Sequence, residues 1–422
     1  MAEGRAGRRG RANLCAYFLL RMAAISRFSG LVCTESIGQG DSREVGLDAL
    51  DEAGRIIYRA EPSTEWPGSA AVRIAKLWLS SERFERSVLN GLEVERINSR
   101  LEAGDFQPEL PTWKEAEDLF FMGSVPNGDG FILDADEAAR LVGEDPINSE
   151  VVRPFLTGKD VTDQPTPVPR RFIINFRDLD LHSAALFARP FQIVSERVRP
   201  ERLKGGSSGW RARIAKYWWR FHTFSPSIYQ ACECLSSVIV LPLNSKHVFP
   251  ARAEASFVYG HSLGVLVRQD HAPFAVLASS LHREWARFQG SKMPSGTIQY
   301  RPGAVFSTFP APWSRLSQRL EDLGLELESR IGELAGANDW SQTAVLNVVN
   351  DPAIDRQEIV GIRQVVEDID FALCENLGLE IGITHEFVED GDAFRYSLSA
   401  KSWAEIRAAL IQLVVSGQGA EP

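Results

Sequence analysis

The chain has 422 residues, of which 44% are hydrophobic and 24% are charged, values that are typical of folded globular proteins and exclude long disorder. Its five cysteines are too few and too scattered for a disulfide framework, so we expect a reducing, cytoplasmic location. No apolar run reaches the roughly 18 residues that a membrane-spanning helix needs, and we expect no membrane partner.

The first 95 residues are predicted to form an α/β segment. Basic residues open the chain and an apolar run follows, as in a targeting peptide, but the run is short, so we predict a helix at residues 12–25. Such a segment lacks the strands needed to close a doubly wound sheet by itself. Strand-like runs are predicted at residues 29–37, 54–61 and 69–80, with a turn-rich connector at 61–68.

The rest of the chain is predicted to be a linker at residues 96–110, a strand-rich domain at 111–310 and a helical domain at 311–422. Between Leu316 and Leu334, apolar residues recur at steps of three and four, which predicts one long amphipathic helix. The overall class is therefore a mixture of α/β and α+β. Strands are predicted at residues 171–176, 191–198, 236–243 and 255–267, and helices at 133–142, 182–189, 273–288, 351–377 and 402–414.

The charge is unevenly distributed along the chain, whose formal net charge is −10. Residues 165–302 hold 19 Lys and Arg against 8 Asp and Glu, whereas residues 303–422 hold 8 against 20. A basic block of this size indicates an anionic partner such as a nucleic acid. The alternative is that acidic flanks neutralise a basic middle within one compact body.

The densest basic stretch is RVRPERLKGGSSGWRARIAKYWWRFH, which begins at residue 197. Its glycine-rich centre predicts a loop, and residues 210–221 predict an amphipathic helix that gathers Trp210, Trp218 and Phe221 on one apolar side. Such a helix would hold its basic stripe against a duplex backbone, although a solvated helix with snorkelling arginines has the same pattern. The residues predicted to contact phosphates are Arg197, Arg199, Arg202, Lys204, Arg211, Arg213, Lys216 and Arg220.

Two polar stretches are predicted to read base edges. Asn244 and Lys246 follow an apolar strand, and Gln299 and Arg301 follow a glycine-containing turn. Amide side chains pair with adenine, and basic side chains pair with guanine. The alternative is an ordinary exit from a strand into a loop.

The sequence offers no catalytic or metal-binding pattern. The glycine-rich strings at residues 37–44 and 123–131 lack the spacing of a P-loop or of a Rossmann fingerprint, so both are predicted to be turns. The cysteines lack zinc spacing, and no nucleophile stands out beside a matched base. A hydrolase that uses one of the central histidines is therefore disfavoured.

Several stretches in order along the chain resemble the C-terminal part of MmeI-like DNA adenine methyltransferases, the large single-chain enzymes of restriction–modification and related phage-defence systems. The similarity runs from about residue 11 to 350 and fades beyond it. The stretches are RANLCAYFLLR, GLVCTESIGQGDSREVGLD, IYRAEPSTEWPGSAAV, LFFMGSVPNGDGFILDADEA, INSEVVRPFLTGKDV, RFIINF, QYRPGAVFSTFPAPW and SQTAVLNVVND.

The resemblance implies a role for each domain. It makes residues 1–95 the end of a Rossmann-like methyltransferase domain, residues 111–310 a target recognition domain and residues 311–422 a helical C-terminal domain. The intact enzymes of the family use S-adenosylmethionine. This chain departs from them because it lacks both their Phe-x-Gly-x-Gly cofactor loop and the Asn-Pro-Pro-Tyr/Phe motif that holds the flipped adenine.

We therefore predict that the chain recognises a specific sequence in double-stranded DNA, as the C-terminal portion of a site-specific N6-adenine methyltransferase. We expect it to hold no cofactor and to be inactive alone. Three alternatives stay open for its origin: a truncated gene, a frameshifted remnant, or one half of a split enzyme whose protein partner is the missing N-terminal methyltransferase half. The alternative function is a non-catalytic assembly subunit that docks through its C-terminal helices.

Overall fold

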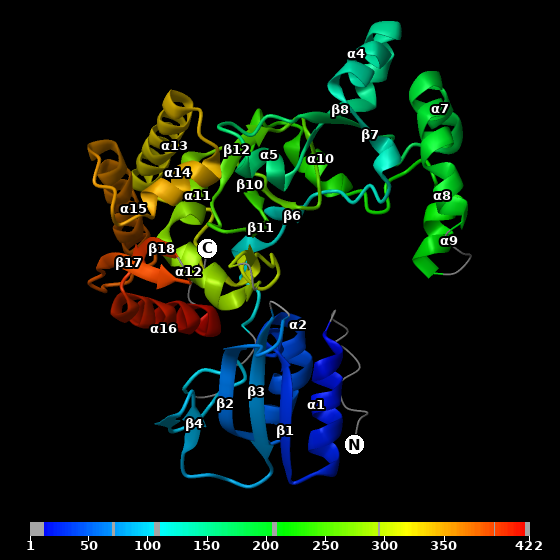
Figure 1. The fold of residues 1–422 in the computed structure, drawn as a ribbon. Coiled ribbons are helices and arrows are strands. Elements are labelled where there is room, and N and C mark those ends of the chain that lie inside the picture. The colour runs from blue at the N-terminus through cyan, green and yellow to red at the C-terminus, as the bar shows by residue number, and fades with distance from the viewer. Residues whose placement is uncertain are drawn as a thin grey trace. The chain divides into compact units, whose positions relative to one another are not determined.

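The computed structural model describes residues 12–69, 72–104, 110–204, 209–293, 296–391 and 393–417. The chain forms two compact units, coloured in Figure 1 from blue at the N-terminus to red at the C-terminus. The first unit is Met1–Pro111 with Arg287–Gln299, and the second is Thr112–Ala286 with Tyr300–Pro422. Among the residues described, no helix is both long and apolar enough to cross a membrane.

A five-stranded sheet with the order β1-β3-β2-β4-β5 forms the first unit. Neighbouring strands are antiparallel except for β2 and β4. The helix α1 (Leu14–Ile25) buries Ala16, Leu19 and Ala23 in the core of this unit. The strands are β1 (Phe28–Thr34), β2 (Ile56–Glu65), β3 (Arg73–Ser80), β4 (Ser87–Leu89) and β5 (Leu92–Val94), and β15 (Ser291–Lys292) pairs with β16 (Ile298–Gln299).

The predicted helix and the three predicted strands of this part are confirmed. The connector predicted at residues 61–68 is wrong over its first half, because β2 continues to Glu65. The register of β2 against β3 shifts between Glu61 and Thr64, and this irregularity accommodates Pro62 within the strand. The glycine-rich string at 37–44 is helical rather than a turn. Its elements are η1 (Glu35–Gly38), α2 (Gly40–Ser42) and η2 (Arg43–Asp48), and α3 (Ala49–Glu52) follows them.

Two four-stranded sheets form the strand-rich part of the second unit, with the orders β12-β10-β14-β6 and β13-β8-β9-β7. Their apolar side chains fill two buried clusters, one of which also contains Trp218, Trp219 and Phe221. The strands are β6 (Phe120–Met122), β7 (Ile132–Leu133), β8 (Val152–Leu156), β9 (Arg171–Ile174), β10 (Ser237–Pro242), β11 (Asn244–Ser245), β12 (Ala251–Glu254), β13 (Val258–Tyr259) and β14 (Leu263–Leu266).

Most predicted elements of this part exist, but the strand predicted at residues 191–198 is wrong. Residues 191–197 lie in the helix α7, and Val198 caps its C-terminal end. Val194 and Val198 are both buried and lie one helical turn apart. The helices are α4 (Ala135–Glu144), α5 (Gly158–Thr162), α6 (Leu181–Ala185), α7 (Ala188–Arg197), α8 (Arg199–Lys204), α9 (Gly209–Lys216), α10 (Pro226–Cys232), α11 (His271–Ala278) and α12 (Ser280–Gln289), with short turns at η3 (Lys114–Ala116), η4 (Asp129–Phe131), η5 (Pro146–Glu150) and η6 (Phe306–Thr308).

The predicted helical C-terminal part is confirmed, with one addition that the sequence pattern did not indicate. A hairpin of β17 (His385–Asp390) and β18 (Ala393–Leu398) lies between the last two helices. Figure 1 shows this part in yellow to red, packed beside α11. The helices are α13 (Gln318–Asn338), α14 (Gln342–Val349), α15 (Gln357–Asn376) and α16 (Ala400–Ser416).

The apolar stripe of α13 is buried inside the second unit. Leu320, Leu327 and Leu334 are at most 7% exposed, and α13 packs against α11 and α15. Gly324 of α13 allows this helix to pack closely against the start of α11, because a Cβ at Gly324 would lie 2.2 Å from the carbonyl oxygen of His271. A leucine stripe on residues 313–334 that is already covered cannot serve as a docking face, so the assembly-subunit alternative, in which this helix docks through its stripe, is wrong on that point.

Candidate nucleic-acid interface

The helices α7, α8 and α9 carry the basic stretch, and Figure 1 shows them as a column within the second unit. The helix predicted over residues 210–221 ends at Lys216. Trp218 and Phe221, which follow the end of this helix, are buried in the core as expected and are 8% and 7% exposed. Trp210, by contrast, is 51% exposed. The placement of Trp210 on a buried face is therefore wrong. The predicted loop at 205–208 lies outside the described residues.

Arg202 is buried and holds this column to the rest of the domain. Its Nη1 donates to the carbonyl oxygens of Trp218 (3.1 Å) and Arg220 (2.5 Å). Its Nη2 donates to those of Pro126 (2.6 Å) and Asn127 (2.9 Å). The side chain is withdrawn from solvent, since the residue is only 4% exposed. A phosphate contact by Arg202 would break this set of bonds, so the structure gives this residue an architectural role.

The surroundings of Arg202 are apolar and positively charged. Its guanidinium lies 5.0 Å from the ring centre of Phe131, and burial lowers its pKa to about 10. Burial also lowers the pKa of His222 nearby, and the charges of Arg213 and Arg202 lower it further. Four carbonyl oxygens accept hydrogen bonds from this buried cation, and it forms no ion pair with a described residue. Its charge therefore adds positive potential beneath the surface.

Four exposed cations of the column form no ion pair with any residue that the structure describes. Three of them lie against aromatic rings: Arg199 over Trp218 at 5.3 Å, Arg211 over Trp210 at 5.5 Å and Lys216 over Tyr217 at 5.2 Å. A ring holds a cation in place without neutralising its charge. These cations, which we call the open cations, therefore stay available to an anionic partner. They are Arg199, Lys204, Arg211 and Lys216.

The remaining three predicted phosphate ligands have partners within the protein. Arg197 donates to the Glu137 carboxylate at 2.6 Å, and this bond lowers the pKa of Glu137. Arg213 donates to the carbonyl of His222, and Nε of Arg220 donates to the carbonyl of Leu179. Backbone carbonyls leave the guanidinium charge in place, so Arg213 and Arg220 still contribute positive potential, whereas Arg197 is largely offset by Glu137.

The sequence reasoning missed two residues of this surface. Trp210 is an exposed aromatic ring among cations, an arrangement that suits stacking on a nucleotide. Arg177 is exposed and lies two residues before Leu179, whose carbonyl accepts from Trp219 and Arg220. The signal for Arg177 was its position directly after the strand at residues 171–176, the rule used to choose Asn244.

The predicted base-reading residues are placed less uniformly. Asn244 is exposed on β11, and Lys246 is exposed but donates to Oδ1 of Asn347 at 2.8 Å. Figure 1 shows β11 away from the column of α7 to α9. Gln299 is exposed at the end of β16 in the first unit, and Arg301 is half-buried in the second.

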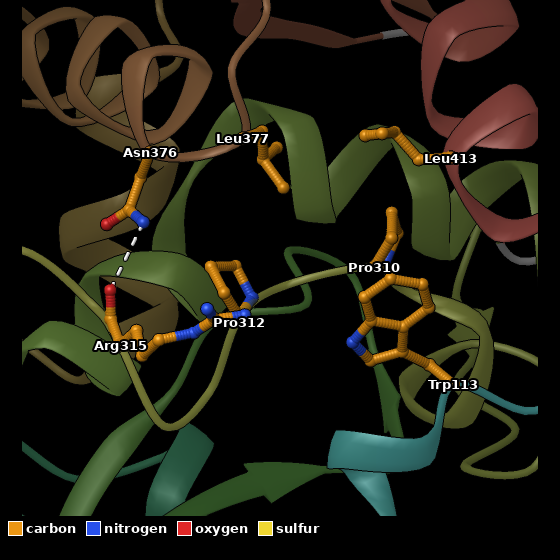
Figure 2. A pocket seen from close by; sticks show the side chains of 7 residues that line it. All are labelled: Trp113, Pro310, Pro312, Arg315, Asn376, Leu377 and Leu413. Carbon is orange, nitrogen blue, oxygen red and sulfur yellow. Dashed lines mark hydrogen bonds between the residues drawn. The ribbon is translucent and has the colours of Figure 1, made fainter. Parts of the chain in front are cut away.

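A pocket of about 310 Å³ lies elsewhere in the second unit (Figure 2). Figure 2 shows its lining, which is mostly apolar, and the Asn376 side chain turned toward the Arg315 backbone. The Asn376 amide is occupied on both sides, because Oδ1 accepts from Ser317 and Nδ2 donates to the carbonyl of Arg315. We therefore assign the pocket no part in phosphate binding. It is lined by Trp113, Pro310, Pro312, Arg315, Asn376, Leu377 and Leu413.

Comparisons with known proteins bear on residues 113–313, which match the family model described as the MmeI target recognition domain. A solved structure of MmeI, a type IIL restriction–modification enzyme, in complex with DNA is similar to the chain, with a TM-score of 0.69 and 16% sequence identity. The alignment covers 96% of this chain and 52% of that one, so the chain spans about half the length of MmeI.

Two further comparisons add nothing to the assignment. The type IIG restriction endonuclease BpuSI aligns over 87% of this chain and 50% of its own with 10% identity, but its TM-score of 0.30 carries no argument. A search of curated proteins gives no match. Residues 113–313 therefore match an MmeI-type target recognition domain, and the fold of the chain is similar to that of MmeI.

Proposed function

We propose that the chain recognises a specific sequence in double-stranded DNA, as the target-reading portion of an MmeI-like restriction–modification protein. The observation that carries the proposal is the set of open cations, which are exposed and not neutralised by acids, within the residues that match a target recognition domain. Such cations supply affinity by releasing counterions from the DNA backbone. The solved MmeI structure, which contains DNA, supports the same reading.

Two groups of residues would make the two kinds of DNA contact, one with the phosphate backbone and one with the base edges. The open cations, together with Arg177 and Trp210, would position the duplex backbone, and this term is independent of sequence. Base discrimination would come from amide and basic side chains on loops, with Asn244, Lys246, Gln299 and Arg301 as the candidates. Loss of a backbone contact should weaken binding to all duplexes equally, whereas loss of a base contact should relax the choice of sequence.

The test is the salt dependence of binding to a labelled duplex, measured by fluorescence anisotropy. Each lost phosphate contact should make the slope of log affinity against log salt less negative by about 0.9. Changing the four open cations to Gln should flatten the slope by roughly 3 to 4 if all of them contact phosphate. The matched control is Arg319→Gln with Arg330→Gln on α13, where both cations are ion-paired. An equal effect of both variants would refute the assignment of this surface.

We propose adenine methylation and phage defence as activities of an intact MmeI-like protein, and not of the described residues by themselves. The residues present do not fit an S-adenosylmethionine loop. A Cβ at Gly123 would lie 2.2 Å from the carbonyl oxygen of Gly260, and one at Gly130 would lie 2.7 Å from Cβ of Arg197. These glycines serve close packing instead of a cofactor cradle. We therefore derive no step through that cofactor and propose that methyl transfer depends on a methyltransferase portion outside residues 12–417.

A further inference from the structure

Arg177 has a backbone conformation that arginine rarely adopts. It follows β9 as the second residue of a tight turn, in which the amide of Leu179 donates to the carbonyl of Phe176 at 3.0 Å. The φ of Arg177 is +51°, which lies in the left-handed region. A turn with a positive φ at its second residue favours glycine, asparagine or aspartate, because their side chains strain the backbone least. An arginine here strains the turn, so we looked for what its side chain does.

Buried polar groups fix this strained conformation. Oδ1 of Asn175 accepts a hydrogen bond from the amide of Arg177 at 2.9 Å, and the backbone amide of Asn175 donates to the carbonyl of Val151 at 2.8 Å. Nδ2 of Asn175 lies 3.5 Å from the hydroxyl of Tyr229. Asn175 itself is only 3% exposed. A strained residue persists where its surroundings hold it in this way, and such residues concentrate at functional sites.

The guanidinium of Arg177 is exposed beside the basic column. Within the described parts of the chain, its side chain forms no hydrogen bond and no ion pair. The turn is tied to the end of the column, because the carbonyl of Leu179 accepts from Nε1 of Trp219 at 2.9 Å and from Nε of Arg220 at 3.0 Å. A rigid turn thus holds an unpaired guanidinium next to the surface proposed to bind the DNA backbone, inside the residues that match a target recognition domain.

The acidic residues that follow Arg177 distinguish a base contact from a phosphate contact. Asp178 is exposed and forms no ion pair with a described residue. Asp180 is also exposed, and its carboxylate accepts from the amide of Ser183 at the start of α6. Two carboxylates this close to the guanidinium repel a phosphate group. The edge of a G·C pair suits both charges, because guanine offers acceptors to arginine and cytosine offers an amino donor to a carboxylate.

We propose that Arg177 reads a guanine in the DNA sequence that the chain recognises, with its guanidinium donating to the O6 and N7 acceptors in the major groove. This inference deepens the proposed function and rests on it. Exposure alone groups Arg177 with the residues that position the backbone, whereas the strained turn and the neighbouring acids assign it to a base edge. Two parallel hydrogen bonds to one base require a side chain with a fixed origin, and the turn held by Asn175 supplies that origin.

The test uses the full chain and a random library of duplexes, from which the bound sequences are selected and sequenced. Fluorescence anisotropy then compares the selected duplex with variants that each change one base pair. Arg177→Gly should reduce discrimination at one G·C pair by about 5- to 150-fold and leave the other positions unchanged. Arg177→Gln should cause the same loss without adding a glycine. The matched control is Lys204→Gln, because the loss of an open cation should weaken binding to all duplexes equally.

The other outcomes each overturn a stated part of the argument. The thermal midpoint of Arg177→Gly should not fall, because relief of strain offsets the extra freedom of an unfolded glycine, and a fall would show that the side chain serves packing. Equal weakening of all duplexes by Arg177→Gly would make Arg177 a phosphate contact, and unchanged discrimination would leave it no part in readout, so either result would overturn the inference alone. If the wild-type chain enriches no sequence, the proposed function fails and this inference fails with it.

Discussion

At the scale of single residues, two buried groups of the second unit carry a disproportionate share of its stability. Arg202 and His282 both lie in the interior, where the two Nη atoms of Arg202 and both ring nitrogens of His282 have specific hydrogen-bond partners. A buried polar group that loses its partner costs far more than an exposed one. Both residues lie within the basic block at residues 165–302, where Arg202 was predicted to contact phosphate.

Arg202→Met should destabilise the second unit. The variant leaves four backbone carbonyls without their donor in the interior, and breaking such a buried charged set costs about 3 kcal/mol or more. Urea unfolding followed by tryptophan fluorescence measures the change. Arg199→Met is the control, because Arg199 is exposed and its guanidinium lies over the face of Trp218. An unchanged midpoint for Arg202→Met would contradict the architectural role.

His282 should make stability fall in mild acid. Complete burial lowers its pKa from 6.5 to about 4, while the ring bonds to Leu277 and to the Tyr300 hydroxyl at 3.0 Å. The unfolded chain therefore binds a proton that the folded chain refuses, so stability is lost as the pH falls from about 6.5 to 4. The loss is about 3 kcal/mol. His282→Gln should remove this part of the pH dependence, and the exposed His261→Gln should not.

At the scale of elements, the helix α13 fastens the C-terminal part to the strand-rich part. Glu321 accepts from the first amides of α11, at His271 and Ala272, and so satisfies the start of that helix. Two helical turns further along α13, the carboxylate of Glu328 accepts a hydrogen bond from Nε of Arg252 on β12 at 2.8 Å. The long acidic helix thus uses two half-buried carboxylates, Glu321 and Glu328, as connectors to the strand-rich part.

Two glycines of α13 should respond in opposite ways to alanine. Gly324→Ala should destabilise by roughly 1 to 3 kcal/mol, because its Cβ would collide with the backbone of α11. Gly332→Ala should stabilise by about 0.5 to 1 kcal/mol, since nothing lies within 4 Å and alanine favours the helix. Thermal unfolding of the two variants measures both. Equal shifts would mean that helix propensity outweighs the close packing.

At the scale of the whole molecule, each unit has a core of its own. The first unit is centred on residues such as Leu77 and Leu79, and the second contains clusters around Phe176 and Val240. Separate cores of this kind fold and unfold as separate cooperative bodies.

Calorimetry should therefore show two unfolding transitions. Leu79→Ala should lower one of them and Phe176→Ala the other, because each removes a side chain that is 1% exposed in one core only. Such truncations cost about 2 to 5 kcal/mol. A single transition that both variants shift equally would show that the units unfold as one.

The sequence by itself determined the mixed fold class, the helix before β1, the strands β1, β3, β9 and β10, and the buried leucine stripe of α13. It did so because local periodicity and composition are enough where one face of an element is apolar and the other is not. The position of the basic block and the family resemblance were also readable from the residues alone, and the match at residues 113–313 agrees with them.

Only the tertiary structure decided which members of that block face solvent. The composition of residues 191–198 and 210–221 does not by itself decide whether they form a strand or a helix. The choice depends on which side chains fill the core. Arg202 and Lys204 are indistinguishable in the sequence, yet one is buried under four carbonyls and the other is exposed. The acceptors that separate them, at residues 126 and 127, are distant along the chain, and folding alone brings them together.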